Sequence, residues 1–369
     1  MGQSLKNSEK SSHANSIFTR AEKLREKSDY HQALRLFRKA FSEYEALSDR
    51  TGVLQCMLSL GDTYRMVGNF DLAEKSYRNA LELLRTLQSA AETADAHVGL
   101  GLSLRAQGRW KEAIPLIRKA KNIYKRLDDR QGLAFASWAE AGAFRIKGDI
   151  HGALRAYRES RKLFTSLKDL HGVGYCLCGL GGASRVAGLS RNSLQYYTAA
   201  NRLFTELRDT FGRAYSFCGI GNAFRMKGDY RSALSNFRKA VSLYRKIGDR
   251  VSYAYTVWGL GTARKMTGNY GSARDYFAEA MALFRSTKDP RGIIYCKMGF
   301  GEIAFLKGRK AAAKRYISDA LENAHTHGFA LEKCHATALL SCITGKIQNA
   351  CYNQLGLKLR FRDLPMNIP

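Results

Sequence analysis

A glycine recurs every forty residues along this chain without slippage. These corner glycines are Gly68, Gly108, Gly148, Gly188, Gly228, Gly268 and Gly308. Seven residues before each of them stands another glycine or an alanine, and five residues after each stands an alanine or a serine. A fixed period of this length is typical of stacked supersecondary units and not of a compact enzyme core. The spacing therefore predicts a repeat solenoid.

Each forty-residue unit has the pattern of two helices. In residues 54–84, Met57, Leu60 and Tyr64 follow helical spacing before Gly68 interrupts the run. A second apolar face follows at Ala73, Tyr77, Ala80 and Leu84. A glycine between two helical runs favours the left-handed conformation that ends a helix. We therefore expect every unit to turn at its corner glycine.

This spacing resembles the tetratricopeptide repeat (TPR). The matching residues of one unit are Gly61, Tyr64, Gly68, Ala73, Tyr77 and Ala80. The resemblance covers residues 15–325 and implies an all-α fold, a right-handed TPR superhelix of about eight helix pairs plus a C-terminal capping helix. It also implies an inner groove lined by the first helix of each pair. Proteins of this kind are usually non-catalytic adaptors.

The repeat departs from the standard TPR unit in its period, which is forty residues instead of thirty-four. The second helix ends in Asp-x-x-Gly, as at Asp129 and Gly132. This long form is similar to the repeats of the LGN/Pins spindle adaptors, kinesin light chain and some bacterial TPR regulators. In LGN-like repeats an asparagine directly after the small residue holds the backbone of a bound peptide. Asn222 occupies that position in one unit and is a candidate binding residue.

The pattern divides the chain into four segments. Residues 1–12 are polar, and we expect a disordered N-terminal tail there. An array of eight repeats follows over residues 13–325, and a capping helix over residues 326–350. Residues 351–369 contain Pro365 and have no clear period, so we predict an irregular C-terminal tail.

Composition narrows the location of the protein. No run of about 18 apolar residues occurs, so we expect no membrane span. The first residues lack the apolar segment of a signal peptide, and we expect a cytoplasmic protein whose eight cysteines are reduced thiols. Gly2 follows Met1, but Lys6 stands where myristoylation prefers serine or threonine, so the sequence does not favour a lipid anchor.

Nothing in the sequence forms a catalytic constellation. The chain lacks a P-loop, a nucleophile elbow and an HExxH helix. We therefore predict that it is not an enzyme and has no cofactor. One stretch near the C-terminus is rich in histidine and cysteine but lacks the paired spacing of a zinc site, so we also predict no metal. Its members are His325, His327, Cys334, His335, Cys342 and Cys351.

Charge is the second informative feature, because the net charge is +28. A basic residue stands three positions before six of the seven corner glycines, and Phe305 breaks the series before Gly308. We call this series the cation ladder. Its members are Arg65, Arg105, Arg145, Arg185, Arg225 and Lys265. A cation near the end of a helix stabilises it, whereas arginine also suits carboxylate and phosphate ligands. The sequence leaves both roles open.

A tyrosine series lies ten residues before the ladder position of each helix that contains it. Its members are Tyr175, Tyr215, Tyr255 and Tyr295. In the last of these helices the ladder position is occupied by Phe305. Ten residues leave two helical positions about 80° apart around the axis, so both series can border one groove. Packing between repeats explains a tyrosine at this spacing equally well.

A second glycine series lies inside the first helices. Its members are Gly99, Gly179, Gly219, Gly259 and Gly299. A glycine inside a helix costs about 1 kcal/mol relative to alanine, so its recurrence indicates that something approaches closely. We favour a neighbouring helix over the backbone of a ligand.

Together these patterns predict a basic TPR scaffold for protein–protein interaction. We expect an acidic, extended protein or peptide segment as the partner, held by the cation ladder, the tyrosines and Asn222. Binding of RNA or single-stranded DNA by the same groove is the alternative, and recognition of a small anionic ligand is a third possibility. The sequence specifies neither the partner's identity nor the oligomeric state.

Overall fold

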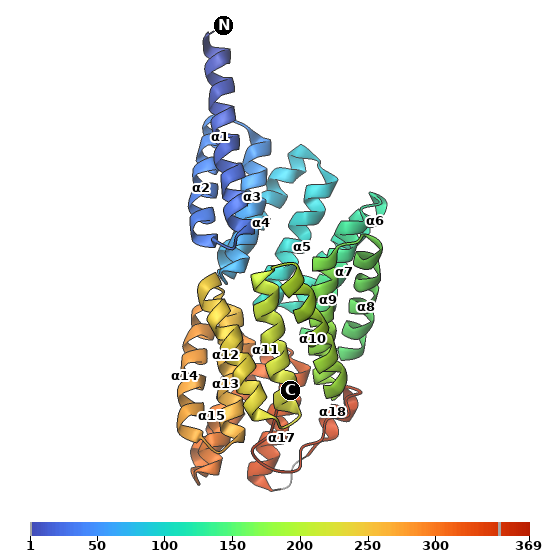
Figure 1. The fold of residues 1–369 in the computed structure, drawn as a ribbon, viewed down its shortest axis with the longest axis vertical. Helices are drawn as coiled ribbons and strands as arrows, with labels where there is room; N and C mark the ends of the chain where they lie inside the picture. Colours follow the sequence, from blue (N-terminus) through green and yellow to red (C-terminus); the bar gives the residue numbers. More distant parts are fainter. Residues whose placement is uncertain (1, 346–347) are drawn as a thin grey trace.

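The structure is a computed structural model that describes residues 2–345 and 348–369, with side-chain surroundings from residue 9 onward. Within these ranges the chain is all-helical and contains no β-strand. Sixteen helices form eight consecutive antiparallel pairs, and two further helices follow them (Figure 1). The expected α-solenoid with a closing helix is therefore confirmed.

The first helices of the pairs are α1 (Gly2–Glu26), α3 (Arg50–Met66), α5 (Ala90–Ala106), α7 (Arg130–Lys147), α9 (Leu170–Val186), α11 (Thr210–Met226), α13 (Arg250–Met266) and α15 (Pro290–Leu306). The second helices are α2 (Tyr30–Ala46), α4 (Phe70–Leu87), α6 (Trp110–Arg126), α8 (Ile150–Ser166), α10 (Ser190–Glu206), α12 (Tyr230–Ile247), α14 (Tyr270–Ser286) and α16 (Lys310–Thr326). The chain ends with α17 (Ala330–Thr344), α18 (Ala350–Gln354) and an irregular segment over residues 355–369.

Local sequence signals set the helix ends. The corner glycines are left-handed, as at Gly148, where φ is 94°. Glycine occupies this region without a Cβ clash, and it ends the first helix of each pair. Asp129 caps the next unit, because its carboxylate accepts a hydrogen bond of 2.8 Å from the backbone N–H of Gly132. The Asp-x-x-Gly signature is therefore a helix N-cap that recurs between repeats.

In most units an aromatic ring of the second helix fills a gap between two first helices, and Ile117 and Ile317 take its place in α6 and α16. A Cβ added to Gly61 would lie 2.7 Å from the Tyr77 ring, and one added to Gly99 would lie 2.2 Å from the same ring. Tyr197 stands in the same way between Gly181 and Gly219. Because the ring takes the space that a side chain would need, the recurring inner glycines serve helix packing. The packing interpretation of these glycines is confirmed.

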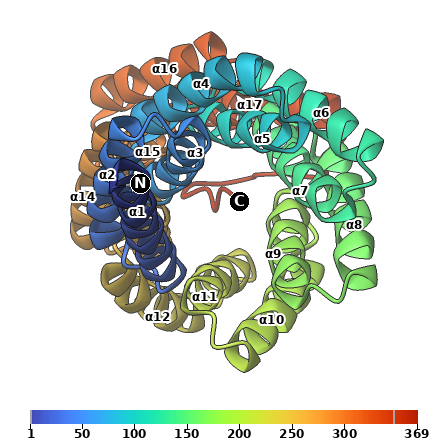
Figure 2. The same cartoon turned by 90° about the horizontal axis from the view of Figure 1, so that it is seen from above.

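The superhelix makes one closed turn and then stacks on itself. Figure 2 shows the helix pairs arranged as a ring around a central lumen, and Figure 1 shows α1–α4 stacked end to end with α12–α15. Trp110 Nε1 donates a hydrogen bond of 3.3 Å to the carbonyl oxygen of His327, and Lys288 pairs with Asp71. These contacts join segments more than 200 residues apart, so the lumen has a complete wall.

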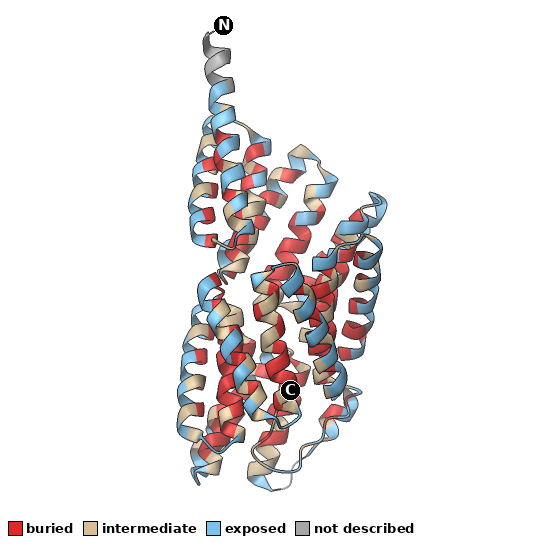
Figure 3. Ribbon diagram, in the orientation of Figure 1, coloured by how far each residue is buried: buried red, intermediate tan, exposed pale blue. Residues whose placement is uncertain are grey.

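Burial follows the two roles of the helices (Figure 3). The first helices α5, α9 and α13 are buried along most of their length, because they contact second helices on one side and line the lumen on the other. The second helices α4, α10 and α14 are buried along one stripe and face the outside with the rest. Residues of the first helices therefore decide what the lumen presents.

The N-terminal segment differs from the expectation. We predicted a disordered tail over residues 1–12, but α1 extends back to Gly2. Residue 1 and the side chains of residues 2–8 lie outside the described part, and Ala14 is the first buried residue after them. A helical end without packing partners frays readily. The mobility of this segment stays a prediction.

The C-terminal segment turns back into the superhelix. The segment over residues 355–369 has no regular secondary structure, and Figure 2 shows the chain end inside the lumen. Leu357, Met366 and Ile368 are buried. Cys334 of α17 and Cys351 of α18 form a disulfide at its root, with their Cα atoms 5.4 Å apart. The expectation of reduced thiols is therefore wrong for this pair, since the fold brings α17 and α18 within bridging distance.

Replacing Gly219 with alanine tests the packing of the aromatic ring. The added Cβ would lie 2.0 Å from Tyr197, so the ring or a helix must move. We expect the free energy of unfolding to fall by roughly 1–3 kcal/mol, which lowers the urea midpoint of unfolding. Gly271→Ala is the control, because nothing lies within 4 Å of its Cβ position, and it should be neutral or stabilising. Equal midpoints for both variants would contradict this packing.

Candidate functional site

The lumen contains two adjoining cavities. The outer chamber has a volume of about 1290 Å³ and lies among helices α1–α13. The inner chamber has a volume of about 260 Å³ and reaches α15 and the end of the chain at Pro369. Arg105, Tyr215 and Ser252 line both chambers. The two chambers therefore share part of their walls.

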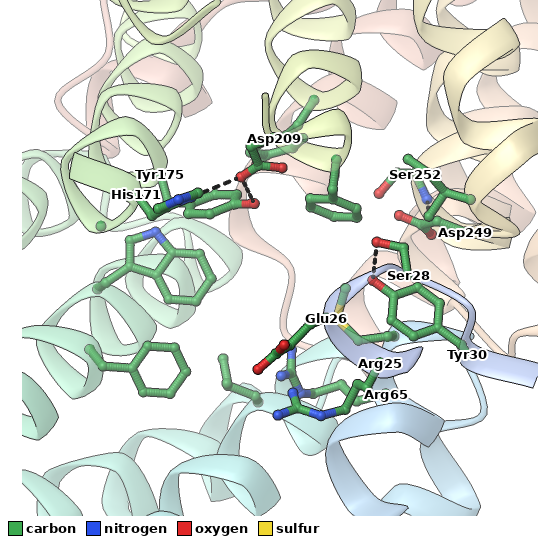
Figure 4. Close-up of a pocket in the computed structure, with 18 of the residues that line it drawn as sticks. Arg25, Glu26, Ser28, Tyr30, Arg65, His171, Tyr175, Asp209, Asp249 and Ser252 are labelled. Atoms are coloured by element: carbon green, nitrogen blue, oxygen red, sulfur yellow. Dashed lines mark hydrogen bonds and ion pairs between the residues drawn. The ribbon is translucent and has the colours of Figure 1, made fainter. Parts of the chain in front are cut away.

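The wall of the outer chamber carries both signs of charge. Figure 4 shows Asp209 and Asp249 across the cavity from Arg25 and Arg65. Asp209 accepts hydrogen bonds from Tyr175 at 3.0 Å and contacts His171 at 3.3 Å. The carboxylates of this wall are Glu26, Asp95, Asp129, Asp169, Asp209 and Asp249. The outer chamber is therefore of mixed charge, and the basic character of the predicted groove stays a prediction.

The inner chamber is basic. Arg105, Arg145 and Arg185 line it, and none of them forms an ion pair within the described residues. The Nε and Nη1 atoms of Arg185 are buried and have no hydrogen-bond partner there. Arg105 stacks over Trp138 at 5.6 Å, and burial lowers its pKa to about 10. We call these three residues the arginine triad.

Two other charged groups of the inner chamber have partners of their own. Asp289 is buried and accepts a 3.0 Å hydrogen bond from the backbone N–H of Gly292, as the N-cap of α15. Arg291 pairs with Glu332 at 2.5 Å. Because three arginines without an ion-pair partner face one carboxylate, the inner chamber has a net positive charge. Desolvated cations without a counter-charge are costly, and an anion entering the chamber would relieve that cost.

Three members of the cation ladder are satisfied within the protein. Arg65 pairs with Asp62 at 3.1 Å beside the outer chamber. Arg225 is fully buried, and its Nε and Nη2 donate to Asn222 Oδ1 at 3.3 and 3.1 Å. Lys265 is buried and pairs with Glu302. Arg225 and Lys265 also contact the C-terminal segment. The ladder therefore divides into three half-buried arginines that face the inner chamber and three cations with partners in the protein.

The four tyrosines pack against neighbouring units and also line the chambers. Tyr175 and Tyr295 donate to carboxylates of the following unit, Tyr295 to Glu332 at 2.8 Å. The ring of Tyr255 packs against Phe284 with centroids 4.7 Å apart. Tyr215 lines both chambers, and burial raises its pKa to about 12, so its hydroxyl stays protonated. Packing between repeats accounts for these positions, whereas ligand contact stays a prediction.

Sequence reasoning missed several residues of this wall. Trp138 and Trp258 lie under Arg105 and Arg225, with the second cation 5.5 Å from its ring. Each tryptophan follows its arginine by thirty-three residues, and this spacing is the signal that was available. Glu302 occupies the repeat position of Asn222, where a lone acid on an apolar helix indicates a buried partner. Nothing in the sequence indicated the path of the C-terminal segment.

Comparison with known sequences agrees with the repeat geometry. The sequence profile of the tetratricopeptide repeat matches residues 13–86 and 92–166. These two segments therefore carry tetratricopeptide repeats. No curated protein sequence matched the chain. The similarity of its long repeat to LGN/Pins and kinesin light chain stays an interpretation.

Solved structures share the fold over nearly the whole chain. A Rap protein complexed with competence and sporulation factor is 13% identical, with a TM-score of 0.62 over 94% of this chain and 99% of that one. The Rap conjugation gene regulator of plasmid pLS20, in complex with the Phr* peptide, is 13% identical, with a TM-score of 0.65 over 85% and 96%. NprR in complex with its cognate peptide NprX is 15% identical, with a TM-score of 0.63 over 92% and 97%.

Two predicted absences concern this region. Among the described residues, no group of three or more His, Cys, Asp or Glu side chains is placed to hold a metal ion. Cys334 and Cys351 are joined to each other, and His335 Nδ1 lies 2.8 Å from the Tyr352 hydroxyl. None of the described helices is long and apolar enough to cross a membrane.

Behind the inner chamber, His335 gives a prediction for the pH dependence of stability. Burial lowers its pKa to about 3, beside Glu332, Arg291 and Arg185. Because the unfolded imidazole titrates near 6.5, its contribution is complete above that pH and is lost as the pH falls toward 3. We expect His335→Gln to reduce the slope of the unfolding free energy between pH 6 and pH 4 by about 1.4 kcal/mol per pH unit.

Chemical denaturation at a series of pH values measures this slope. The exposed His325 supplies the control, since His325→Gln should keep the slope of the original chain. An unchanged slope in folded His335→Gln would contradict the buried, neutral state of His335.

Proposed function

We propose that this protein is a non-catalytic binding scaffold whose lumen takes an acidic, extended segment of a protein partner. The observation that carries the proposal is the arginine triad of Arg105, Arg145 and Arg185, which lines the inner chamber and forms no ion pair among the described residues. Arginine forms charge-assisted, bidentate hydrogen bonds with carboxylates. Carboxylates of the partner would supply the missing acceptors.

The shape of the lumen supports an extended ligand. The outer chamber has room for several residues of a peptide and narrows into the inner chamber at Arg105 and Tyr215. Its mixed charge suits a segment with both polar and charged residues, whereas the inner chamber selects for negative charge. The Rap regulator of plasmid pLS20 and NprR were solved with bound peptides. Their common architecture makes a peptide the first ligand class to test.

Replacement of the triad tests this function. We expect Arg105→Gln, Arg145→Gln and Arg185→Gln together to weaken binding of a hexa-aspartate peptide at least about tenfold, because each charged hydrogen bond is worth roughly 1.5–3 kcal/mol. The matched control replaces Arg158, Arg202 and Arg238, which are exposed on second helices, and removes the same net charge. Isothermal titration calorimetry at fixed ionic strength measures both.

Stability separates a ligand role of the triad from a structural one. If these arginines only complement helix ends, the triple variant should lose on the order of 1–3 kcal/mol of stability. If they are uncompensated ligand-binding groups, stability should be unchanged or higher, because repulsion and desolvation are removed. Equal peptide affinity in the triad and control variants would contradict the proposed site.

Two other ligand classes are outcomes of the same experiment. Oligo-uridylate that bound more tightly than hexa-aspartate, with a salt slope reduced by about 0.7 per lost contact in the triad variant, would favour single-stranded nucleic acid. Pyrophosphate that bound while hexa-aspartate did not would favour a small anion. Either result would replace the acidic segment as the partner.

A further inference from the structure

The C-terminal segment lies on the inner wall in the manner of a bound peptide. The backbone of Met366 is held from both sides, because Lys265 Nζ donates to its carbonyl oxygen at 2.8 Å and its N–H donates to Glu302. Both residues come from first helices, α13 and α15. On the side of the segment, both contacts involve only backbone atoms of Met366. An extended segment of another chain could make them equally well.

The next residue is recognised through its side chain. The Asn367 amide donates to the backbone carbonyl oxygen of Arg225 at 2.7 Å, and its oxygen accepts from Arg225 Nη1. An asparagine satisfies a donor and an acceptor at once, whereas an aspartate would set a carboxylate against the carbonyl oxygen. The geometry therefore selects asparagine over its near-isostere.

The flanking residues are apolar and buried. Met366 is 1% exposed and Ile368 is 4% exposed. The chain ends beside the arginine triad, since Pro369 lines the inner chamber. The contacts of residues 366–368 thus define a subsite for an apolar residue, an asparagine and a second apolar residue in extended conformation.

The cation ladder links this subsite to the proposed ligand wall. Arg225 and Lys265 occupy the same repeat position as the triad, but the C-terminal segment covers them. No carboxylate of the segment pairs with Arg225 in the described structure, and burial lowers the pKa of this guanidinium to about 9. The segment therefore covers Arg225 without supplying a counter-charge for its guanidinium.

We propose that residues 364–369 are an intramolecular ligand of a peptide-binding subsite formed by Arg225, Lys265 and Glu302. The partner that fits this subsite is an extended segment with an asparagine between two apolar residues, and it competes with the chain's own end. The disulfide between Cys334 and Cys351 anchors the root of the segment. A tethered ligand acts at an effective concentration of the order of millimolar, so the subsite is closed to weak competitors.

The test uses the full chain and a neutral peptide with the sequence of residues 364–369, acetylated and amidated so that no charge reaches the triad. Met366→Glu places a carboxylate at a side-chain position that is 1% exposed, and the cost of burying that charge should release the segment while leaving the wall intact. We expect this variant to bind the peptide about tenfold more tightly than the original chain. A peptide with aspartate in place of Asn367 should bind the variant about tenfold less tightly than the native peptide.

Hydrogen exchange of residues 364–369 reports independently on the segment. The Met366 amide should be protected in the original chain and exposed in Met366→Glu, whereas Asn353→Ala, an exposed control on α18, should resemble the original. Asn367→Ala, a milder change, should give partial release. Calorimetry follows peptide binding in each folded variant.

Two results would overturn the proposal. The first is a released segment, shown by rapid exchange, in a folded chain that binds the peptide no better than the original. The second is persistent protection in Met366→Glu, which would show that other contacts hold the segment. Because the probe is neutral, these outcomes do not depend on whether the partner of the inner chamber is acidic.

Discussion

The structure depends on one contact that recurs in most units, an aromatic ring held between small residues of two consecutive first helices. Tyr77 separates Gly61 from Gly99, and Tyr197 separates Gly181 from Gly219, at distances that exclude a Cβ. The ring fixes both the spacing within a pair and the spacing between pairs. Its repetition sets the curvature that closes the superhelix on itself. The forty-residue period of the sequence reflects the recurrence of this contact.

Because the curvature is fixed, residues at one repeat position lie at equivalent places on the lumen wall in successive units. The ladder position lies near the C-terminal end of every first helix, so its cations follow the inner surface from unit to unit. Asp62, Glu302 and Asn222 satisfy some of them, and the triad stays without a partner in the described residues. The result is a chamber with a net positive charge inside a lumen of mixed charge.

The helix pairs, the turning points and the closing helix could be predicted, because the glycine, alanine and aromatic positions act locally and recur. The candidate cations and tyrosines could also be placed on the first helices. Their environments could not, because Asp62 and Glu302 neutralise two of them through contacts specific to single units. The path of the C-terminal segment depends on Asn367 meeting Arg225 across 142 residues, and no periodic pattern encodes such a pair.

The redox state of the two cysteines in the C-terminal cap could not be predicted either, because it also depends on a contact that no periodic pattern encodes. Cys334 and Cys351 are seventeen residues apart, and only the return of α18 against α17 brings them together. Closing a loop of this length stabilises a fold by about 3 kcal/mol in the chain-entropy account. The disulfide therefore belongs to the anchoring of the C-terminal segment, which the composition of the chain does not reveal.

The central claim is that the arginine triad is an uncompensated anion site inside the lumen. Crystals soaked in iodide and examined by anomalous scattering test it most directly, because the ion is located without any assumption about the partner. The account predicts an ordered iodide in the inner chamber within contact of Arg105, Arg145 or Arg185. Iodide found on the exposed arginines of the second helices, with the inner chamber empty, would contradict it.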